Sequence, residues 1–325
     1  MNILAIETSC DETAAAVLDG ATVLAEVVHS QAMHARFGGV VPEIASRAHV
    51  EQVVPTVLAA LARAGIHRPD VVAATAGPGL VGAVLVGLSF GKSLALGWGT
   101  PFVAVNHLEG HLLSATLESP APQFPFLSLV ISGGHTTLYL ARAVGSYDVL
   151  AETDDDAVGE AFDKVARLCG LGYPGGPKVD ALAPSGNPHA IKLPLPRPIQ
   201  HPRNWSFSGI KSAVRQTLER QPKLLPADIA ASFQDTVARY LVERVVYFAA
   251  ATGVRRVAIG GGAAANAGIR AALVATGLEV FLPPRSRCTD NAAMIGNVAR
   301  LHLAAGFAAS DLSLTARPRW AVGAA

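Results

Sequence analysis

The sequence has few charged residues and few cysteines. Charged side chains make up 16% of the 325 residues and the net charge is +1. This argues against a surface that coats nucleic acid broadly, but it leaves room for a local basic patch. The three cysteines, Cys10, Cys169 and Cys288, are far apart and odd in number, which fits a reducing compartment better than a disulfide framework. Half of the residues are hydrophobic, enough to bury a core in one large domain or two ordinary ones.

We also expect no secretory leader and no membrane span. The first residues run straight into a strand-like segment, without a basic region before an apolar one. Leu80 to Gly97 is the segment that most resembles a span, but it contains Gly82, Gly87, Gly91 and Lys92. These residues suit a buried or interface helix better than a lipid-facing one. The sequence therefore predicts a cytoplasmic protein.

A pattern of three short apolar segments occurs twice, and each time helices and further strands follow. The segments are 2–7, 14–18 and 22–28, and then 126–131, 135–141 and 147–152. A duplicated βββαβα unit resembles the actin-like, sugar-kinase-like ATPases, in which two related domains hold a nucleotide between them. We therefore expect an α/β protein with a duplicated actin-like (ASKHA, ribonuclease H-like) fold, two domains and a central cleft.

One helix of the first half has a readable apolar face. Pro42 to Ala64 has a helical pattern, and its proline suits a first turn. Val54, Val57, Leu58 and Leu61 form the apolar stripe that we expect to face the core.

Two histidines, His107 and His111, form a candidate metal site. Residues four apart lie on one face of a helix, so both imidazoles can reach one ion. Asn106 is a good N-cap, and Glu109 can complete something close to a capping box. The missing oxygen ligand could be Asp290, which we expect to cap a final helix. Two surface histidines and a plain N-cap aspartate are the alternatives.

Small polar turns follow the first strand of each repeat. Thr8 to Thr13 is rich in hydroxyls and carboxylates, and Val130 to Gly134 ends in two glycines that let backbone N–H groups approach an anion. A further glycine cluster, 260–262, enters a helix after a strand and is followed by Asn266. It lacks both the Gly-Lys-Ser/Thr of a P-loop and the Rossmann spacing. For the two turns after the first strands, ordinary hairpin turns are the alternative.

Two further segments have polar residues that can contact a ligand. The turn-rich loop 171–177 can press its backbone against a flat ligand, with Asp163 and Asp180 available for sugar hydroxyls. Beyond a proline-dense stretch, basic residues are interleaved with aromatic ones, a pattern that can hold a phosphate backbone and stack a base. These residues are Arg203, Trp205, Phe207, Lys211 and Arg215. A surface connection and a helix N-terminus with solvated charges are the respective alternatives.

Taken together, eight motifs resemble one known family, the tRNA N6-adenosine threonylcarbamoyltransferases (the TsaD, formerly Gcp, family). The resemblance extends from the first strand to about residue 297. The motifs are Ile6-Glu7-Thr8-Ser9-Cys10-Asp11-Glu12-Thr13, His107-Leu108-Glu109-Gly110-His111, Ser132-Gly133-Gly134-His135-Thr136, Gly159-Glu160-Ala161-Phe162-Asp163-Lys164, Tyr173-Pro174-Gly175-Gly176-Pro177, Phe207-Ser208-Gly209, Ser232-Phe233-Gln234-Asp235 and Cys288-Thr289-Asp290-Asn291.

The resemblance implies a site and a reaction. His107, His111 and Asp290 would bind one Fe²⁺ per subunit, although Zn²⁺ also suits these ligands. The implied reaction transfers a threonylcarbamoyl group from threonylcarbamoyl-adenylate to N6 of the adenosine next to the anticodon. The acceptors are tRNAs that read codons beginning with A, and AMP is released. The implied substrate-binding residues are Val130, Ile131, Ser132, Gly133, Gly134, Asp163, Gly176, Asp180 and Asn266.

The resemblance also implies partners and domain limits. The expected partners are tRNA, a paralogous actin-like subunit (TsaB-like) and a small ATPase (TsaE-like). Our own hypothesis is that the paralogue contacts the helix at 80–97, because its small residues permit close approach of another helix. We expect an N-terminal domain at 1–106, completed by a C-terminal helix at about 296–325. The second domain, 107–295, would hold the metal and nucleotide cleft.

Two other functions compete with the transferase. A metalloprotease needs a general base beside its metal, as in His-Glu-x-x-His, but Glu109 is two residues after the first histidine. A non-catalytic actin-like scaffold subunit has no need of His107, His111 and Asp290 together. Both alternatives are therefore weaker than the transferase.

Overall fold

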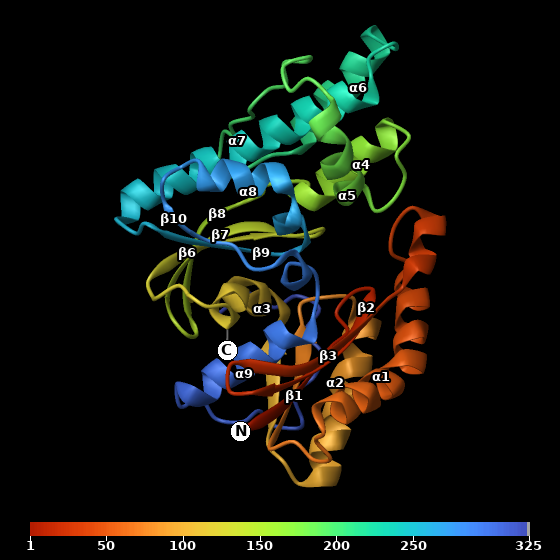
Figure 1. Ribbon diagram of the computed structural model, residues 1–325, viewed down its shortest axis with the longest axis vertical. Coiled ribbons are helices and arrows are strands. Elements are labelled where there is room, and N and C mark those ends of the chain that lie inside the picture. Colours follow the sequence, from red (N-terminus) through yellow and green to blue (C-terminus); the bar gives the residue numbers. More distant parts are fainter. Residues whose placement is uncertain (324–325) are drawn as a thin grey trace. The chain divides into compact units, whose positions relative to one another are not determined.

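The computed structural model describes residues 1–323, which form two compact units. The first unit comprises Met1–Ala121, Ala143–Tyr147 and Asp290–Ala325, and the second comprises Pro122–Arg142 and Asp148–Thr289. Each unit contains one five-stranded sheet with its own hydrophobic core (Figure 1).

The two sheets have the same topology. The first contains β1 (Asn2–Glu7), β2 (Glu12–Asp19), β3 (Thr22–Ser30), β4 (Val71–Gly77) and β5 (Phe102–Asn106), in the order β3-β2-β1-β4-β5. The second contains β6 (Phe126–Ile131), β7 (Thr136–Ala143), β8 (Ser146–Glu152), β9 (Arg256–Gly260) and β10 (Glu279–Phe281), in the order β8-β7-β6-β9-β10. In both, the first strand pairs antiparallel with the second and parallel with the fourth. The predicted α/β duplication is confirmed.

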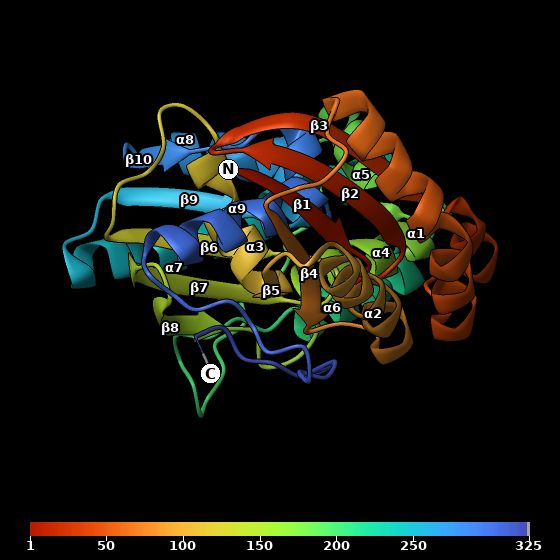
Figure 2. The same ribbon diagram turned by 90° about the horizontal axis from the view of Figure 1, so that it is seen from below.

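Helices cover both faces of the first sheet (Figures 1 and 2). One face packs against α1 (Pro42–Ala64) and α2 (Val81–Trp98), and its strand residues include Leu4 and Ile6. The other face packs against α9 (Ala292–Ala304), where Gly296 lies close to Ala5 and Leu18. The alternation along β1 follows from the two-residue period of a strand.

The predicted apolar stripe of α1 is half correct. Val57 and Leu61 are buried, but Val54 and Leu58 are 44% and 61% exposed. Val53 is buried in place of Val54. On a helix with 3.6 residues per turn, a shift of one position turns a side chain by about 100°, so the sequence pattern alone did not fix which of two neighbouring valines faces the sheet.

Helix α2 has the length and hydropathy of a membrane span, but a third of its apolar window is buried in the first unit. The glycines of α2 explain why this part of the helix is buried. A Cβ on Gly91 would lie 3.1 Å from the side chain of Ala74 on β4, and a Cβ on Gly87 would overlap Thr8 Oγ1. The glycine face therefore packs closely on the sheet, as a buried helix requires.

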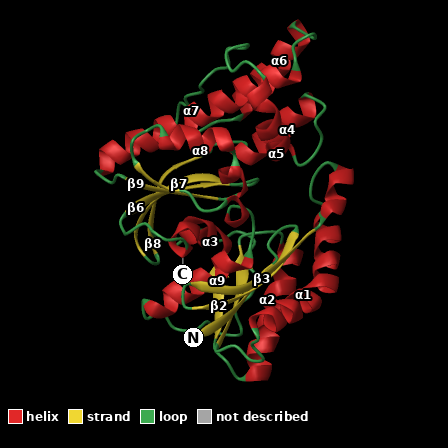
Figure 3. Ribbon diagram, in the orientation of Figure 1, coloured by secondary structure: helices red, strands yellow, loops and turns green. Residues whose placement is uncertain are grey.

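In the second unit, helices pack on one face of the sheet (Figure 3). They are α4 (Val158–Leu168), α5 (Gly175–Leu182), α6 (Ser208–Arg220), α7 (Pro226–Thr252) and α8 (Ala267–Val274). The core contains strand residues Leu129 and Ile259 together with Phe162 of α4 and Phe233 of α7. The two phenylalanine rings meet edge to face, with centroids 5.0 Å apart.

The division into units differs from the expected domain limits at residue 106. Helix α3 (His107–Leu113) and the segment up to Ala121 belong to the first unit. The reason is that α3 continues directly from β5 and packs against α9. Consequently, the three candidate metal ligands all lie in the first unit, whereas we had placed the metal in the second domain.

We predict opposite effects for two glycine-to-alanine changes in α2. Gly87→Ala should destabilise the protein by about 1–3 kcal/mol, because the new methyl must displace the buried Thr8 side chain. Gly97→Ala should be neutral or stabilising by up to about 1 kcal/mol, since among residues 1–323 no atom lies within 4 Å of its added Cβ. Thermal unfolding of both variants checks this; equal midpoints would contradict the packing argument.

Candidate functional site

Three parallel strands of the first unit carry the residues around the candidate metal site. β1 pairs with β4 and β4 with β5, all parallel, so their carboxyl ends lie at one edge of the sheet. Glu7 ends β1, Thr75 lies near the end of β4, and Asn106 ends β5. Ligand sites of open α/β sheets form at such an edge.

Asn106 starts α3, as expected. Its Oδ1 accepts hydrogen bonds from the backbone N–H groups of Leu108 and Glu109, at 2.9 and 3.3 Å. Its Nδ2 donates to the Trp320 carbonyl, at 3.1 Å. The cap fixes the first turn of α3, so His107 and His111 leave the helix on one face.

The expected capping box does not form, because the Glu109 carboxylate is bound elsewhere. Its Oε1 accepts from the Tyr147 hydroxyl and faces His302 Nε2, both at 2.7 Å. Glu109 is 4% exposed. A carboxylate held in this way is not available as the general base of a metalloprotease.

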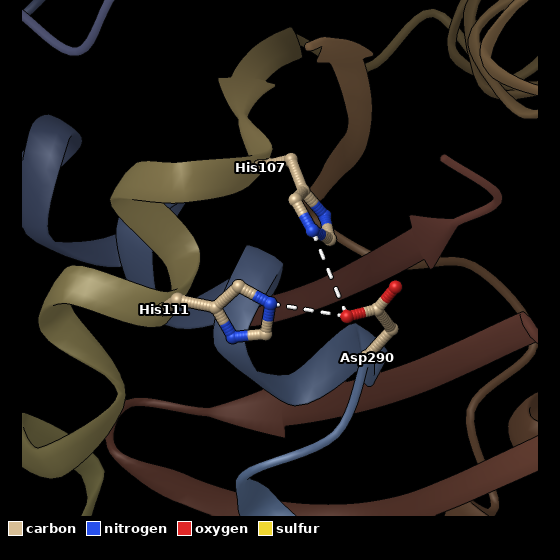
Figure 4. Close-up of side chains that lie close together, drawn as sticks. All are labelled: His107, His111 and Asp290. Atoms are coloured by element: carbon tan, nitrogen blue, oxygen red, sulfur yellow. Dashed lines mark hydrogen bonds and ion pairs between the residues drawn. The ribbon is translucent and has the colours of Figure 1, made fainter. Parts of the chain in front are cut away.

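The structure brings His107, His111 and Asp290 together (Figure 4). Asp290 Oδ1 lies 3.0 Å from His111 Nε2 and 3.6 Å from His107 Nε2. One ligand atom from each of the three residues lies within 4.8 Å of the others. The two imidazole rings are nearly perpendicular, with an interplanar angle of 84°.

Asp290 is not the N-cap of α9, which corrects the sequence prediction. Asn291 takes that position, with extended backbone dihedrals and an Oδ1 that accepts from Met294 N at 3.0 Å. Both residue types cap helices well, so the pattern did not distinguish them. Because Asn291 caps the helix, the Asp290 carboxylate faces the two histidines instead.

Glu7 and Thr75, which lie behind His107, were not identified as site residues from the sequence, whereas Ser9 belongs to the predicted polar turn Thr8–Thr13. His107 Nδ1 lies 3.0 Å from Glu7 Oε2 and 3.0 Å from Ser9 Oγ. Glu7 is fully buried and also accepts hydrogen bonds from the Ser9 backbone N–H and the Thr75 hydroxyl. The sequence did contain one indication of this role, a glutamate at the end of an apolar strand. Such a carboxylate is expected to be buried, and a buried carboxylate needs hydrogen-bond partners.

The site carries surplus negative charge. Burial, together with the nearby Asp290 and Asp11 carboxylates, raises the pKa of Glu12 to about 9. Burial disfavours the charged imidazolium of His107, but Glu7 and Asp290 outweigh burial and raise the pKa of His107 to about 9. The same pairing lowers the pKa of Glu7, although its burial acts in the opposite direction. Carboxylates therefore draw a proton or a cation into this site.

The residues fit a metal ion in three respects. Two imidazoles and a carboxylate are a ligand set for Fe²⁺ or Zn²⁺. With bonds of about 2.0–2.2 Å, ligands of one ion lie about 3–3.5 Å apart, close to the 3.0 and 3.6 Å separations here. The carboxylate partner of His107 Nδ1 is the usual outer contact of a metal-bound histidine.

In the second unit, the turn after β6 meets two other segments. Gly159 N, at the start of α4, donates to the Ser132 carbonyl at 3.1 Å. Gly261, after β9, has φ of +91°, and a Cβ there would overlap the Ile131 carbonyl. Among residues 1–323, no atom lies within 4 Å of a Cβ built on Gly133 or Gly134. Ile131 and Ser132 are thus in close contact with neighbouring segments, whereas the space beside Gly133 and Gly134 is open.

Further hydrogen bonds connect the other predicted binding residues of this unit. Asp163 Oδ1 accepts from Gly175 N at 2.7 Å, and Asp180 Oδ1 accepts from Ala267 N at 2.8 Å. Asn266 caps α8 by accepting from Ile269 N at 2.9 Å. These contacts run from α4 to α5 and from α5 to α8, so the residues that we predicted to bind substrate border one another.

Two predictions for this unit are wrong. The loop 171–177 does not extend through its glycine pair, because Gly175 and Gly176 begin α5, and a proline is tolerated in that first turn. The basic and aromatic cluster does not present rings for base stacking, because Trp205 and Phe207 are fully buried. Lys211 pairs with Asp156 at 3.1 Å. The alternative reading, a helix N-terminus, is the correct one.

The fold is shared with solved proteins of low sequence identity. Full-length HypF, solved in a phosphate- and nucleotide-bound form, superposes with a TM-score of 0.64 at 15% identity, covering 93% of this chain and 55% of that chain. Component A of (R)-2-hydroxyglutaryl-CoA dehydratase from Acidaminococcus fermentans gives 0.56 at 17% identity, covering 94% and 99%. These likenesses agree with the predicted duplicated actin-like fold.

Sequence comparisons identify the family. The model of the TsaD family, tRNA N6-adenosine threonylcarbamoyltransferase, matches residues 22–297. A protein of that name from Trichlorobacter lovleyi is 50% identical over 98% of this chain and 96% of its own length. Another from a Nostoc species is 51% identical over 94% and 92%. The chain therefore belongs to the tRNA N6-adenosine threonylcarbamoyltransferase family, and it is a tRNA-modifying transferase.

Proposed function

We propose that this chain transfers a threonylcarbamoyl group from threonylcarbamoyl-adenylate to N6 of the adenosine next to the anticodon, in tRNAs that read codons beginning with A. AMP is the second product. The observation that supports this most directly is the convergence of His107, His111 and Asp290 in a member of this transferase family. The metalloprotease and scaffold alternatives are not favoured.

We propose that His107, His111 and Asp290 hold one Fe²⁺ per subunit, with Zn²⁺ as the alternative. When bound, such an ion supplies Lewis-acid polarisation of the carbamoyl carbonyl. Glu7 holds the His107 ring in place, and Asn106 fixes the helix turn from which both imidazoles project. Asp11 or Glu12 is proposed to position the acceptor or assist proton transfer.

The proposed nucleotide site lies in the second unit. The backbone N–H groups of the turn Val130–Gly134 are proposed to bind the phosphate of the adenylate, because the glycines leave room for an anion. Asp163, Gly176, Asp180 and Asn266 are proposed to bind the sugar and base. In the transfer, the N6 amine forms a bond to the carbamoyl carbon and loses a proton, and the bond from that carbon to the phosphate oxygen breaks. The turn then retains AMP until release.

Further partners are proposed from the family resemblance. A TsaB-like paralogue is proposed to pack on α2, where Val81, Leu85 and Leu96 are 57%, 51% and 71% exposed. A small TsaE-like ATPase completes the proposed complex. The proposed location is the cytoplasm, where tRNA is available.

Removal of one metal ligand should slow the reaction strongly. His111→Ala is expected to lower the rate of tRNA modification about 100- to 1000-fold, because a Lewis acid contributes several kcal/mol. Protein, partner subunits, tRNA and enzymatically made threonylcarbamoyl-adenylate are mixed, and nucleosides are analysed by mass spectrometry. His67→Ala, an exposed histidine of the same unit, is the control. The proposal is contradicted if the His111→Ala variant modifies tRNA at an unchanged rate. It is also contradicted if the unchanged protein has protease activity that His111→Ala removes.

A methyl group at the proposed phosphate turn should affect binding but not folding. Gly134→Ala meets no described atom within 4 Å and has no left-handed φ, so the thermal midpoint should stay unchanged. The affinity for AMP should fall about tenfold or more, which corresponds to about 1.4 kcal/mol. Calorimetric titration with AMP measures this, with Gly97→Ala as the control. Equal AMP affinities would place the phosphate elsewhere.

Metal affinity should depend on pH in a defined direction. The pKa of His107 is raised to about 9 in the metal-free protein, so below that pH a proton competes with the metal. Affinity should therefore rise with pH between about 6 and about 9, by up to about tenfold per unit. Zn²⁺ titrations in buffers of different ionisation enthalpy should show about one proton released per ion. A flat pH profile would exclude His107 as a ligand.

A further inference from the structure

The carboxylate of Glu7 is bound by three groups of the first unit. It accepts from the Ser9 backbone N–H and the Thr75 hydroxyl, and His107 Nδ1 lies 3.0 Å from its Oε2. Glu7 is fully buried. A buried ionised carboxylate accepts hydrogen bonds and cannot donate them, so Nδ1 of His107 must carry the proton of this contact.

A proton on Nδ1 has a direct consequence for the other ring nitrogen. A metal ion binds the neutral imidazole, in which only one nitrogen is protonated. With that proton on Nδ1, the lone pair of His107 Nε2 is the one available to the ion. This nitrogen faces Asp290 Oδ1, at 3.6 Å. The Ser9 hydroxyl, also 3.0 Å from Nδ1, could favour either tautomer, because a hydroxyl both donates and accepts. The glutamate removes this ambiguity.

The second histidine of the pair lacks such a contact. Nδ1 of His111 is buried and has no hydrogen-bond partner among residues 1–323. One imidazole is thus oriented in advance by two neighbouring strands, since Glu7 ends β1 and Thr75 belongs to β4. The other imidazole is oriented by the helix and by Asp290.

We propose that Glu7 is a positioning residue of the metal site: it fixes the His107 tautomer that leaves Nε2 free for the ion. The inference rests on the proposed metal function of His107, His111 and Asp290, and it extends that function to a residue that does not touch the metal. Outer carboxylates of this kind typically change metal affinity 10- to 100-fold.

The test uses Co²⁺ alone as the probe, titrated into the metal-free full chain and followed by its visible absorption. Glu7→Gln should weaken Co²⁺ binding about 10- to 100-fold. In one orientation, the amide NH₂ of the glutamine faces the Ser9 N–H, so that two donors oppose each other. In the other orientation, the NH₂ donates to His107 Nδ1 and favours the tautomer with its proton on Nε2. Thr75→Val keeps the carboxylate but removes one of its donors, and should give a smaller loss of affinity.

The matched control is Glu109→Gln, which also neutralises a buried carboxylate of the first unit. Glu109 lies between the two histidines in sequence, but its carboxylate contacts Tyr147 and His302 instead. Its Co²⁺ affinity should stay within about threefold of that of the unchanged protein, well below the 10-fold minimum for an outer ligand. An equal loss in both glutamine variants would overturn the proposal.

A double-mutant cycle separates positioning from general stability. If Glu7 acts through His107, Glu7→Gln should cause no further loss of Co²⁺ affinity in a His107→Ala background. An additive loss would overturn the proposal, and circular dichroism establishes that each variant is folded. If the unchanged protein binds no Co²⁺, the metal function and this inference fail together. If it binds Co²⁺ and Glu7→Gln binds equally well, only this inference fails.

Discussion

Parallel pairing of β1, β4 and β5 is the constraint on which the candidate metal site depends. It places the ends of three strands at one edge, so that Glu7 and Thr75 come within hydrogen-bonding reach. β5 leads directly into α3 and orients His107 toward the same edge. The backbone hydrogen bonds of the sheet thus hold Glu7 and the start of α3 in place, and a change in strand register would move Glu7 away from His107.

Much of the fold was predictable because it follows from local pattern. The alternation of short apolar segments and turns defined both repeats, and Pro42 with the following pattern gave the bounds of α1. The pair His107 and His111 was identified from spacing, since four residues make about one helical turn. The residue types and turns made Asp290, Asp163, Asp180 and the Val130–Gly134 turn candidates, and the family resemblance assigned the full set of metal-binding and substrate-binding roles. The structure brings Asp290 to the two histidines.

What the sequence did not determine depends on contacts between distant segments. Apart from the Ser9 N–H beside Glu7, the partners of Glu7 and Glu109 come from distant elements, and no local pattern contains them. Asn291 caps α9 although its neighbour is an equally good cap, because the choice depends on what each side chain meets. The burial of Trp205 and Phe207 likewise reflects packing against α7. Propensity is a weak guide wherever tertiary contacts decide.

The order of the chain has a consequence for how the site is made. Two ligands lie in the first 121 residues, but Asp290 lies after the whole of the second unit. During synthesis the ribosome therefore exposes both histidines before the carboxylate exists outside it. Domains fold as units while the chain elongates at about 5–20 residues per second, and the second unit is almost continuous in sequence. It follows that the three-ligand site closes only after the whole second unit has been synthesised.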